Sequence, residues 1–247
     1  MADEITEDHW LKDVDMWKYR AIFFDADDTL FDYGAAEREA FVRTAEAFGL
    51  GARLEEAHAV YRVHNGNVWR ELERGEITQD ELKVERFRRV LRAMEVDEGP
   101  AAAMSPYYLD RLSEQTQLLP GAEDAVRAAG ERHLLVLVTN GLTTVQRRRF
   151  AASPITRHFQ RILISEELGV AKPDPAIFYP ALEEFSLRPE DVLLVGDSTS
   201  SDMPAARNAG MDFCWINPGR DPVPAGLHAK YDIGNVGELV ALLGPGK

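Results

Sequence analysis

The second half of the chain alternates short apolar runs with segments of helical periodicity, and this alternation limits the fold more than any other feature. An earlier apolar run, 22–24, has the same character as the later ones. Continuous apolar strands joined by helices predict a parallel, doubly wound α/β sheet with helices on both faces. The later strands are expected at 134–138, 161–164, 192–195, 213–216 and 229–233, and the helices at 122–131, 143–152, 175–185, 199–209 and 236–243.

Between the first apolar run and residue 119 the pattern is helical throughout. Apolar residues such as Phe41, Ala45 and Phe48 recur at helical spacing. Thr78 followed by Glu81 predicts a capping box at the start of one helix. We therefore expect a four-helix domain inserted into the α/β core. The expected parts are an N-terminal extension at 1–18, a core domain at 19–32 and 119–247, and a helical domain at 33–118.

The charge of the chain limits its partners. Lys and Arg number 28 against 42 Asp and Glu, a formal net charge of −14. This balance disfavours a nucleic acid polymer or an anionic membrane surface, since both need a basic protein face. A small phosphorylated metabolite remains a suitable partner, because a metal ion and one lysine can reverse the field locally. The sequence leaves the oligomeric state open.

Other features indicate where the protein works. No apolar run approaches the roughly 20 residues that span a bilayer. The N-terminus is acidic and lacks the basic start and apolar core of a secretory signal, so we expect a cytoplasmic protein. Cys214 is the single cysteine, which excludes an internal disulfide.

The apolar run at 22–24 ends in acidic residues, Asp25, Asp27 and Asp28. Carboxylates at the end of a buried strand repel one another and lose water. A divalent cation such as Mg²⁺, which prefers oxygen ligands, would make such a cluster tolerable. Asp-Asp-Thr after a strand is also an ordinary solvated turn with a helix cap. This run alone leaves both interpretations open.

Polar residues also follow the next expected strands, at the edge of the sheet where ligands bind in such folds. Thr139, Asn140 and Gly141 precede a helix, where a hydroxyl, a carboxamide and free backbone N–H groups either hold phosphate oxygens or cap a plain turn. Lys172 stands before a Pro-Asp-Pro corner in which Asp174 is the candidate N-cap. Such a lysine is either a charge held at this edge or a solvated side chain.

A second acidic pair follows the strand expected at 192–195. Gly196 allows close approach, Asp197 stands at the strand end, and Asp202 is expected about one turn into the following helix, facing back toward the site. Gly-Asp-Ser alone is a weak signal, because Ser and Asp cap helices generally. Parallel topology would bring this pair to the edge that carries the first acidic cluster.

Taken together, these motifs resemble those of the haloacid dehalogenase-like (HAD) phosphatase superfamily, from about Arg20 to Leu243. The resemblance implies a Rossmann-type core with the helical insertion as a mobile cap. More narrowly, the segments 25–32, 138–143, 165–174 and 214–217 resemble bacterial pyrimidine 5′-nucleotidases. The matching motifs are Asp25-x-Asp27-x-Thr29, Thr139-Asn140-Gly141, Lys172 and Gly196-Asp197-x-x-x-x-Asp202.

The resemblance implies a two-step phosphoryl transfer. Asp25 is expected to attack the phosphorus and form an aspartyl-phosphate, while Asp27 acts as general acid and then as base. Mg²⁺ is expected to bind the Asp25 carboxylate, the Asp27 main-chain carbonyl and Asp197. Asp202, which orients the metal's waters, and Ser198 are expected to lie behind these ligands without binding the metal directly.

The remaining core motifs are assigned to phosphate and to the loop. Thr139, Asn140, Gly141 and Lys172 are expected to hold the phosphate oxygens. Thr29 is expected to brace the first loop rather than touch the substrate. The substrates implied by the resemblance are (deoxy)nucleoside 5′-monophosphates such as UMP, dUMP or dTMP.

Substrate choice is expected to lie in the helical domain, which closes over the leaving group. Within the polar run 64–70, Asn65, Asn67 and Trp69 are the candidates for base and sugar contacts, with Phe31 and Tyr33 at the hinge. An aromatic residue such as Trp69 on an amphipathic helix is equally explained as a core residue.

Three alternatives remain. A dehalogenase uses the same aspartate nucleophile but lacks the second aspartate, so Asp27 argues against it. A phosphatase or phosphomutase acting on a sugar phosphate keeps both aspartates and is disfavoured only by the likeness to the nucleotidases. A non-catalytic binding protein on the same fold would need a lost catalytic position, and all of them are present.

Overall fold

The computed structural model describes residues 16–244 and divides them into two compact units. The sheet unit contains the described residues up to Asp32, together with Leu118–Thr143 and the described residues from Ser153 onward. The helical unit contains Tyr33–Gln117 and Thr144–Ala152. The segment Thr144–Ala152, expected in the core domain, therefore groups with the helical unit. Residues 1–15 of the expected N-terminal extension lie outside the described residues, which begin with a short 3₁₀-helix, η2 (Met16–Lys18).

The sheet unit is built on a six-stranded sheet with the order β3-β2-β1-β4-β5-β6, and every neighbouring pair is parallel. This order and the helices between the strands confirm the predicted doubly wound α/β fold. The last strand is shorter than the sequence predicts. The strands are β1 (Ala21–Phe24), β2 (Leu134–Thr139), β3 (Arg161–Ile164), β4 (Val192–Gly196), β5 (Asp212–Ile216) and β6 (Tyr231–Ile233).

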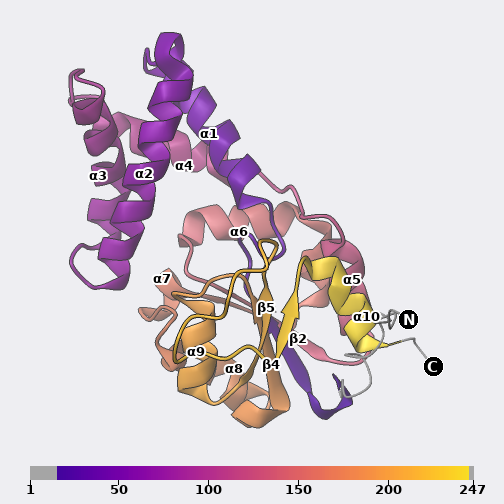
Figure 1. Ribbon diagram of the computed structural model, residues 1–247. Helices are drawn as coiled ribbons and strands as arrows, with labels where there is room; N and C mark the ends of the chain where they lie inside the picture. The colour runs from indigo at the N-terminus through magenta and orange to yellow at the C-terminus, as the bar shows by residue number, and fades with distance from the viewer. Residues whose placement is uncertain (1–15, 245–247) are drawn as a thin grey trace, which may run out of the picture. The chain divides into compact units, whose positions relative to one another are not determined.

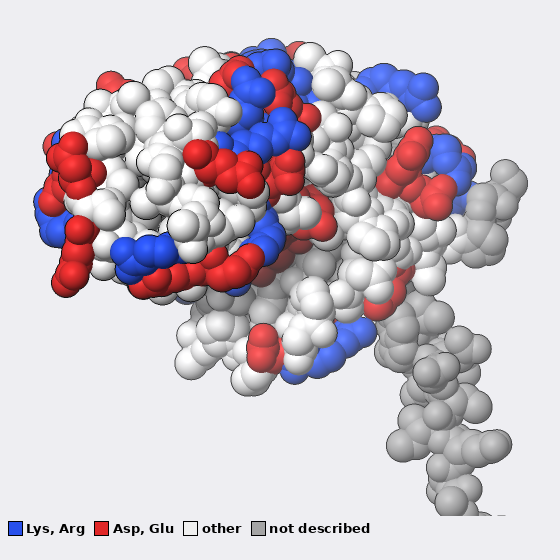
Figure 2. Space-filling model, turned by 90° about the horizontal axis from the view of Figure 1, so that it is seen from above, with Lys and Arg blue, Asp and Glu red and all other residues white. Residues whose placement is uncertain are grey.

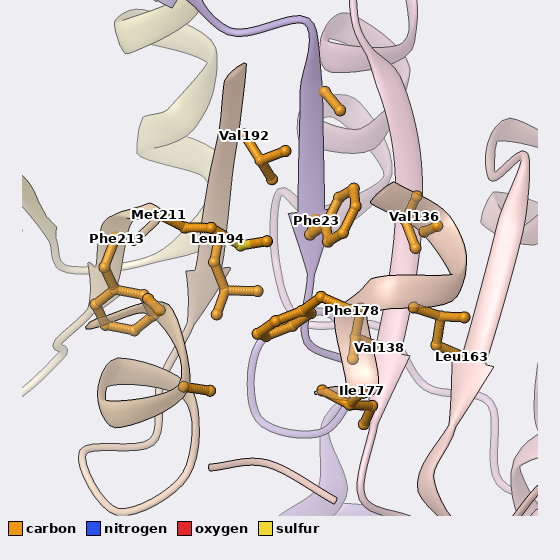
Figure 3. Close-up of a cluster of buried hydrophobic side chains, with 14 of the residues drawn as sticks. Phe23, Val136, Val138, Leu163, Ile177, Phe178, Val192, Leu194, Met211 and Phe213 are labelled. Atoms are coloured by element: carbon orange, nitrogen blue, oxygen red, sulfur yellow. The ribbon is translucent and has the colours of Figure 1, made fainter. Parts of the chain in front are cut away.

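The central strands are buried on both faces, which explains why their sequences are continuous apolar runs rather than alternating ones. One face carries a hydrophobic cluster that includes Phe23, Leu194 and Phe213 of the strands together with Ile177 and Phe178 from the segment after β3 (Figure 3). Alternate residues point to this face because successive side chains of a strand lie on opposite sides. Packing of this cluster holds the strands in place, and it thereby sets the positions of their carboxyl ends.

The helices of the sheet unit lie on both faces of the sheet (Figure 1). The helix predicted at 175–185 begins as a 3₁₀ turn, with Asp174 accepting a hydrogen bond from Ala176 N at 2.9 Å as the expected N-cap. The helix predicted at 199–209 begins only at Asp202. The helical segments are α5 (Ala122–Gly130), η4 (Pro154–His158), α7 (Ser165–Leu168), η5 (Pro175–Phe178), α8 (Tyr179–Glu184), η6 (Pro189–Asp191), α9 (Asp202–Ala209), η7 (Val236–Glu238) and α10 (Leu239–Leu243).

The helical unit contains the four long helices that the sequence predicts, and the predicted capping box is present. Thr78 Oγ1 accepts from Glu81 N at 3.2 Å, and Thr78 N donates to Glu81 Oε2 at 2.8 Å. The unit also takes in most of α6 (Thr143–Ala152), where Arg149 Nε donates to Gln115 O at 2.9 Å. The other helices are α1 (Tyr33–Ala47), η3 (Gly51–Arg53), α2 (Leu54–Glu73), α3 (Gln79–Ala93) and α4 (Ala101–Ser113).

Charged side chains of both signs are interspersed on the face shown in Figure 2. In the described part of the chain many charged side chains form ion pairs, such as Arg53 with Glu56 at 2.7 Å and Arg89 with Glu71 at 2.7 Å. The face therefore offers no continuous basic stripe among the residues drawn there. Within residues 16–244, no helix is long and apolar enough to cross a membrane.

Candidate active site

Two neighbouring strands end with acidic side chains at the centre of the sheet. The order of the strands reverses between β1 and β4, because the chain runs outward from β1 to β3 and then returns to β4. The hydrogen-bond ladder continues just past β1, where Asp25 N donates to Val195 O at 2.9 Å. Asp25 and Asp197 therefore leave the sheet close together at its carboxyl edge, where ligands bind in open α/β sheets.

Three carboxylates gather at this edge, those of Asp25, Asp197 and Asp202. One oxygen atom of each lies within 4.8 Å of the others. Asp25 and Asp202 are buried, and Asp197 is half-buried. The two side chains expected as metal ligands are thus together, and Asp202, expected behind them, is in the same cluster.

Lys172 lies inside this acidic cluster. Its side chain is 2% exposed, and Nζ lies 2.5 Å from Asp25 Oδ1 and 2.7 Å from Asp202 Oδ1. Nζ also donates to Val138 O at 3.1 Å. The side chain is therefore held at the edge of the sheet rather than solvated, and it joins two acidic residues from different motifs.

Asp202 occupies a different position in its helix from the one predicted. It is the first residue of α9, not a residue one turn inside it, because 199–201 form a turn. Its Oδ2 accepts from Ser198 N at 3.1 Å, which closes that turn and delays the start of the helix. The side chain lies directly over Gly196, where an added Cβ would be 2.4 Å from Asp202 Oδ2. Gly196 is thus the residue that lets this carboxylate reach the cluster.

The buried carboxylates are electrostatically unfavourable without a further cation. Burial, together with the neighbouring carboxylates, raises the pKa of Asp197 to about 9. Burial likewise raises the pKa of Asp25 to about 7, although Lys172 opposes this increase. The pKa of Lys172 lies above its ordinary value: burial lowers it, and Asp202 and Asp25 together raise it by more.

The donor set fits a hard divalent cation. Three carboxylates and one ammonium leave two negative charges when all four groups are ionised, and one divalent cation balances them. The groups supplied are oxygen ligands, which Mg²⁺ prefers, and the cluster contains no histidine or cysteine. Lys172 engages Oδ1 of both Asp25 and Asp202, and Asp202 Oδ2 also accepts from Ser198 N.

The loop after β2 is locked to the lysine segment. Asn140 Oδ1 accepts from Lys172 N at 2.9 Å, and Asn140 Nδ2 donates to Lys172 O at 2.8 Å. Thr139 is buried, and its Oγ1 accepts from Gly141 N at 3.1 Å. The motifs around Thr139 and Lys172 therefore form one rigid element rather than two separate turns.

The free helix N-terminus expected after this loop is partly occupied. Thr143 N, at the start of α6, donates to Glu166 Oε2 at 2.6 Å. A carboxylate at this position satisfies a helix donor that the sequence analysis left free for phosphate. Within the loop, Gly141 N–H already donates to Thr139 Oγ1, so the Asn140 N–H is the remaining loop candidate for that task. No sequence signal linked Glu166 to a helix that begins 23 residues earlier.

The remaining residues of the first motif lie in a tight loop. Asp27 is half-buried and forms an isolated parallel bridge with Phe31. Asp28 is exposed and has a φ of 59°, in the left-handed region. Thr29 is fully buried, and its Oγ1 donates to Asp197 Oδ1 at 3.4 Å. Thr29 thus braces the loop from inside, as expected.

The candidates for substrate choice are placed unevenly. Phe31 is fully buried in the sheet unit, where it bridges to Leu118, and Tyr33 begins α1. In α2, Asn65 is buried, whereas Asn67 and Trp69 are half-buried. The structure does not bring these five side chains together within one unit.

Asn65 belongs to a buried polar network of the helical unit. Its Nδ2 donates to Glu37 Oε2 at 3.0 Å, and its Oδ1 accepts from Arg86 Nη1 at 3.3 Å. Arg86 is 1% exposed, and its charge lies 5.3 Å from the ring centre of Tyr108. This network cannot be predicted from local sequence patterns, because Glu37, Asn65 and Arg86 come from three different helices.

Comparisons with known proteins agree with this geometry. The model of the haloacid dehalogenase-like hydrolase family matches residues 19–210. YfnB of Bacillus subtilis is 32% identical over 231 residues, which cover 92% of this chain and 97% of YfnB. A crystal structure of YfnB bound to magnesium has a TM-score of 0.85 to this chain and covers 92% of it and 99% of YfnB.

Two pyrimidine 5′-nucleotidases are also similar. PynA of Streptococcus pneumoniae is 34% identical over 81% of this chain and 84% of its own length. YjjG of Escherichia coli is 30% identical over 92% of this chain and 98% of its own length. The resemblance found in the sequence motifs is confirmed. The chain belongs to the haloacid dehalogenase-like hydrolase family and is a hydrolase whose relatives include pyrimidine 5′-nucleotidases.

Proposed function

We propose that the protein is a Mg²⁺-dependent phosphomonoester hydrolase that works through an aspartyl-phosphate on Asp25. The observation that carries the proposal is the buried contact of Asp25 with Lys172 inside a cluster of three carboxylates. A carboxylate beside a fixed ammonium at the carboxyl edge of the sheet is suited to act as a nucleophile on an anionic phosphate, because the positive charge offsets repulsion between the two anions.

In the first step an Asp25 oxygen forms a bond to phosphorus while the bond to the leaving oxygen of the ester breaks. Asp27, two residues along the same loop and half-buried, supplies the proton to the leaving oxygen. In the second step Asp27 takes a proton from water, the water oxygen bonds to phosphorus, and the bond to Asp25 breaks. Inorganic phosphate and the free carboxylate of Asp25 result.

The phosphoryl group would be held by the element that joins the Thr139 and Lys172 motifs. Lys172 Nζ and the Asn140 N–H are the candidate donors to its equatorial oxygens, and the Gly141 N–H would have to exchange Thr139 Oγ1 for a phosphate oxygen. The Asn140 side chain ties this loop to the Lys172 main chain through two hydrogen bonds, so the two motifs are held together before the substrate arrives. Mg²⁺, held by Asp25, Asp197 and the Asp27 main-chain carbonyl, would supply charge neutralisation for the phosphate and its nucleophile, with Asp202 and Ser198 supporting this site.

The proposed substrates are (deoxy)nucleoside 5′-monophosphates such as UMP, dUMP or dTMP. Similarity to PynA and YjjG over most of the chain supports this class, since both are pyrimidine 5′-nucleotidases. The helical unit is proposed as the mobile cap, with Trp69, Asn67 and Tyr33 as candidate contacts to the base and sugar. Asn65 is a weaker candidate, because both ends of its amide are bonded inside the unit.

Phosphate release from a panel of substrates tests the proposal. The panel contains UMP, dUMP, dTMP, AMP and a set of sugar phosphates, each with Mg²⁺ or with EDTA. We expect Mg²⁺-dependent release, greatest for the pyrimidine nucleotides. Release from sugar phosphates alone would overturn the substrate class but keep the chemistry. Turnover that is unchanged in EDTA after removal of bound metal would refute the requirement for Mg²⁺.

Matched variants test the nucleophile. Asp25→Asn is expected to abolish turnover while leaving the protein folded, since it keeps the shape of the side chain. Asp28→Asn is the control, because Asp28 is exposed in the same loop and asparagine also adopts its positive φ. Quenched Asp27→Asn protein is expected to carry a phosphoryl group on Asp25 by mass spectrometry. Turnover by Asp25→Asn at the wild-type rate would refute the covalent step.

A further inference from the structure

Trp215 makes a direct polar contact with the loop that carries Asp197. Its Nε1 donates to Asp197 O at 2.9 Å. Trp215 is the fourth residue of β5, is 4% exposed, and pairs in register with Gly196 of β4. The indole therefore crosses from one strand to the residue that immediately follows the other.

This contact restrains Asp197 at its main chain. β4 ends at Gly196, so the carbonyl of Asp197 is the first one beyond the strand. A main-chain carbonyl fixed by a buried donor sets the orientation of the peptide plane and of the Cα that bears the side chain. The carboxylate of Asp197 is also held from the first loop, where Thr29 Oγ1 donates to Oδ1 at 3.4 Å. Main chain and side chain are thus each held by a separate donor.

The ring of Trp215 is itself fixed by the core. It belongs to the hydrophobic cluster on one face of the sheet, together with Phe213 of its own strand and Met203 and Ala206 of α9. α9 begins with Asp202, so the helix that packs in this cluster also carries the third carboxylate. Trp215 therefore packs in the same cluster as α9, which carries Asp202. It is also hydrogen-bonded to Asp197.

We propose that Trp215 is a positioning residue for the metal site: its indole N–H holds the Asp197 main chain so that the Asp197 carboxylate stays in the cluster with Asp25 and Asp202. The inference rests on the proposed function only in taking Mg²⁺ as the bound ion. It does not depend on the substrate. Packing in the core fixes the position of the Trp215 indole. The hydrogen bond from its N–H then connects the core to Asp197 in the metal site.

Binding of Mg²⁺ to the metal-free protein, measured by isothermal titration calorimetry without substrate, tests the proposal. Trp215→Phe keeps an aromatic ring in the core and removes the N–H. We expect its Kd for Mg²⁺ to rise roughly three- to tenfold, the effect of losing one neutral hydrogen bond. The Mg²⁺ concentration for half-maximal hydrolysis of the best substrate is expected to rise by the same factor, with kcat at saturating Mg²⁺ near the wild-type value.

Phe213→Leu is the matched control, because Phe213 lies two residues away on the same strand face and in the same cluster. It is expected to lower stability, as Trp215→Phe does, but to leave the Kd for Mg²⁺ within about twofold of wild type. An unchanged Kd in Trp215→Phe, or an equal rise in both variants, would overturn the inference. A wild-type protein that binds no Mg²⁺ would overturn both the metal assignment and this inference, whereas a wrong substrate class would leave the binding result intact.

Discussion

Lys172 Nζ lies 2.7 Å from Asp202 Oδ1, and both side chains are buried. The ammonium that the family resemblance assigns to phosphate is thus bonded to an acidic side chain assigned to support of the metal. A second contact, 2.5 Å to Asp25 Oδ1, joins the same ammonium to the proposed nucleophile. The proposed phosphate-binding and metal-binding parts of the site are consequently one electrostatic unit, and a change in one is expected to affect the other.

Replacement of Lys172 by methionine is expected to reduce both stability and activity. The change keeps the length of the side chain but leaves Asp25 and Asp202 without their cation in a buried site. Removing one partner of a buried ion pair costs about 3–5 kcal/mol, so a loss of about 3 kcal/mol is expected in urea unfolding with EDTA. Turnover is expected to fall at least about a hundredfold, since the charge proposed to stabilise the transferring phosphate is lost.

Lys230→Met is the control for this change. Lys230 Nζ lies 3.2 Å from Asp212 Oδ2, and the side chains are 37% and 33% exposed. A pair this exposed contributes within about 1 kcal/mol. Equal losses of stability in the two variants would contradict a special role for the buried pair.

The stability of the metal-free protein is expected to fall as the pH rises. Burial and neighbouring carboxylates raise the pKa of Asp197 to about 9 and that of Asp25 to about 7, from ordinary values of 3.8. The folded protein therefore binds these protons more tightly than the unfolded chain does. Their contribution is complete below about pH 4 and is lost as the pH rises toward about 9.

Urea midpoints measured with EDTA at pH 5, 7 and 9 check this dependence, with Asp197→Asn as the comparison. The variant removes the group with the higher pKa, so its stability should decline less over the same range. It is also expected to be more stable than wild type at pH 9 without metal, by on the order of 1–2 kcal/mol. Parallel pH profiles of the two proteins would show that Asp197 does not titrate in this way.

Mg²⁺ is expected to stabilise the wild-type protein and not Asp197→Asn. A ligand that binds only the folded state raises the free energy of unfolding by about 2.7 kcal/mol at 100 times its Kd. Loss of the carboxylate that is proposed as one of the charged ligands should abolish most of this effect. Thermal unfolding with and without Mg²⁺ measures it, and equal stabilisation of both proteins would remove Asp197 from the metal site.

Replacement of Gly196 by alanine is expected to displace the Asp202 carboxylate from the acidic cluster. The new Cβ would lie 2.4 Å from Asp202 Oδ2, so the carboxylate or the strand end must move. Turnover is expected to fall at least about tenfold, because small displacements of reacting groups have large effects on rate. Gly130→Ala is the control, since its nearest neighbour would be Leu135 Cδ1 at 3.5 Å, an ordinary contact. Unchanged turnover in Gly196→Ala would show that Asp202 can move without consequence.

Asn65 and Asn67 are expected to behave differently when each is replaced by alanine. Asn65→Ala removes the buried hydrogen bonds to Glu37 Oε2 and Arg86 Nη1 and should lower the free energy of unfolding by about 1–3 kcal/mol. Asn67 is half-buried and accepts from Arg70 Nη2 at 2.6 Å in an exposed hydrogen bond, so its loss should cost less than about 0.5 kcal/mol.

The two variants are compared by urea unfolding and by KM for the best substrate. A higher KM in Asn67→Ala without a loss of stability would support Asn67 as a substrate contact. A stable Asn65→Ala protein with a raised KM would show that Asn65 faces the substrate rather than the network.

The sequence by itself determined the fold class, the strands and the order of the motifs. Each strand is a buried apolar run and each motif follows one, and both signals are local, so they do not depend on what the rest of the chain does. The capping box at Thr78 and the N-cap at Asp174 are local for the same reason, and both are confirmed. Local patterns are less reliable for the exact ends of helices. Residues 199–201 include good helix-capping residues and yet form a turn before α9.

Only the tertiary structure decided which side chains meet. Lys172 bonds Asp202, Trp215 bonds Asp197, and Asn65 is enclosed by Glu37 and Arg86. Each of these contacts depends on the order and register of strands or on the packing of helices that are far apart in the chain. These contacts are stabilised by burial and charge pairing between residues far apart in the chain. Periodicity in the sequence carries no information about such pairs.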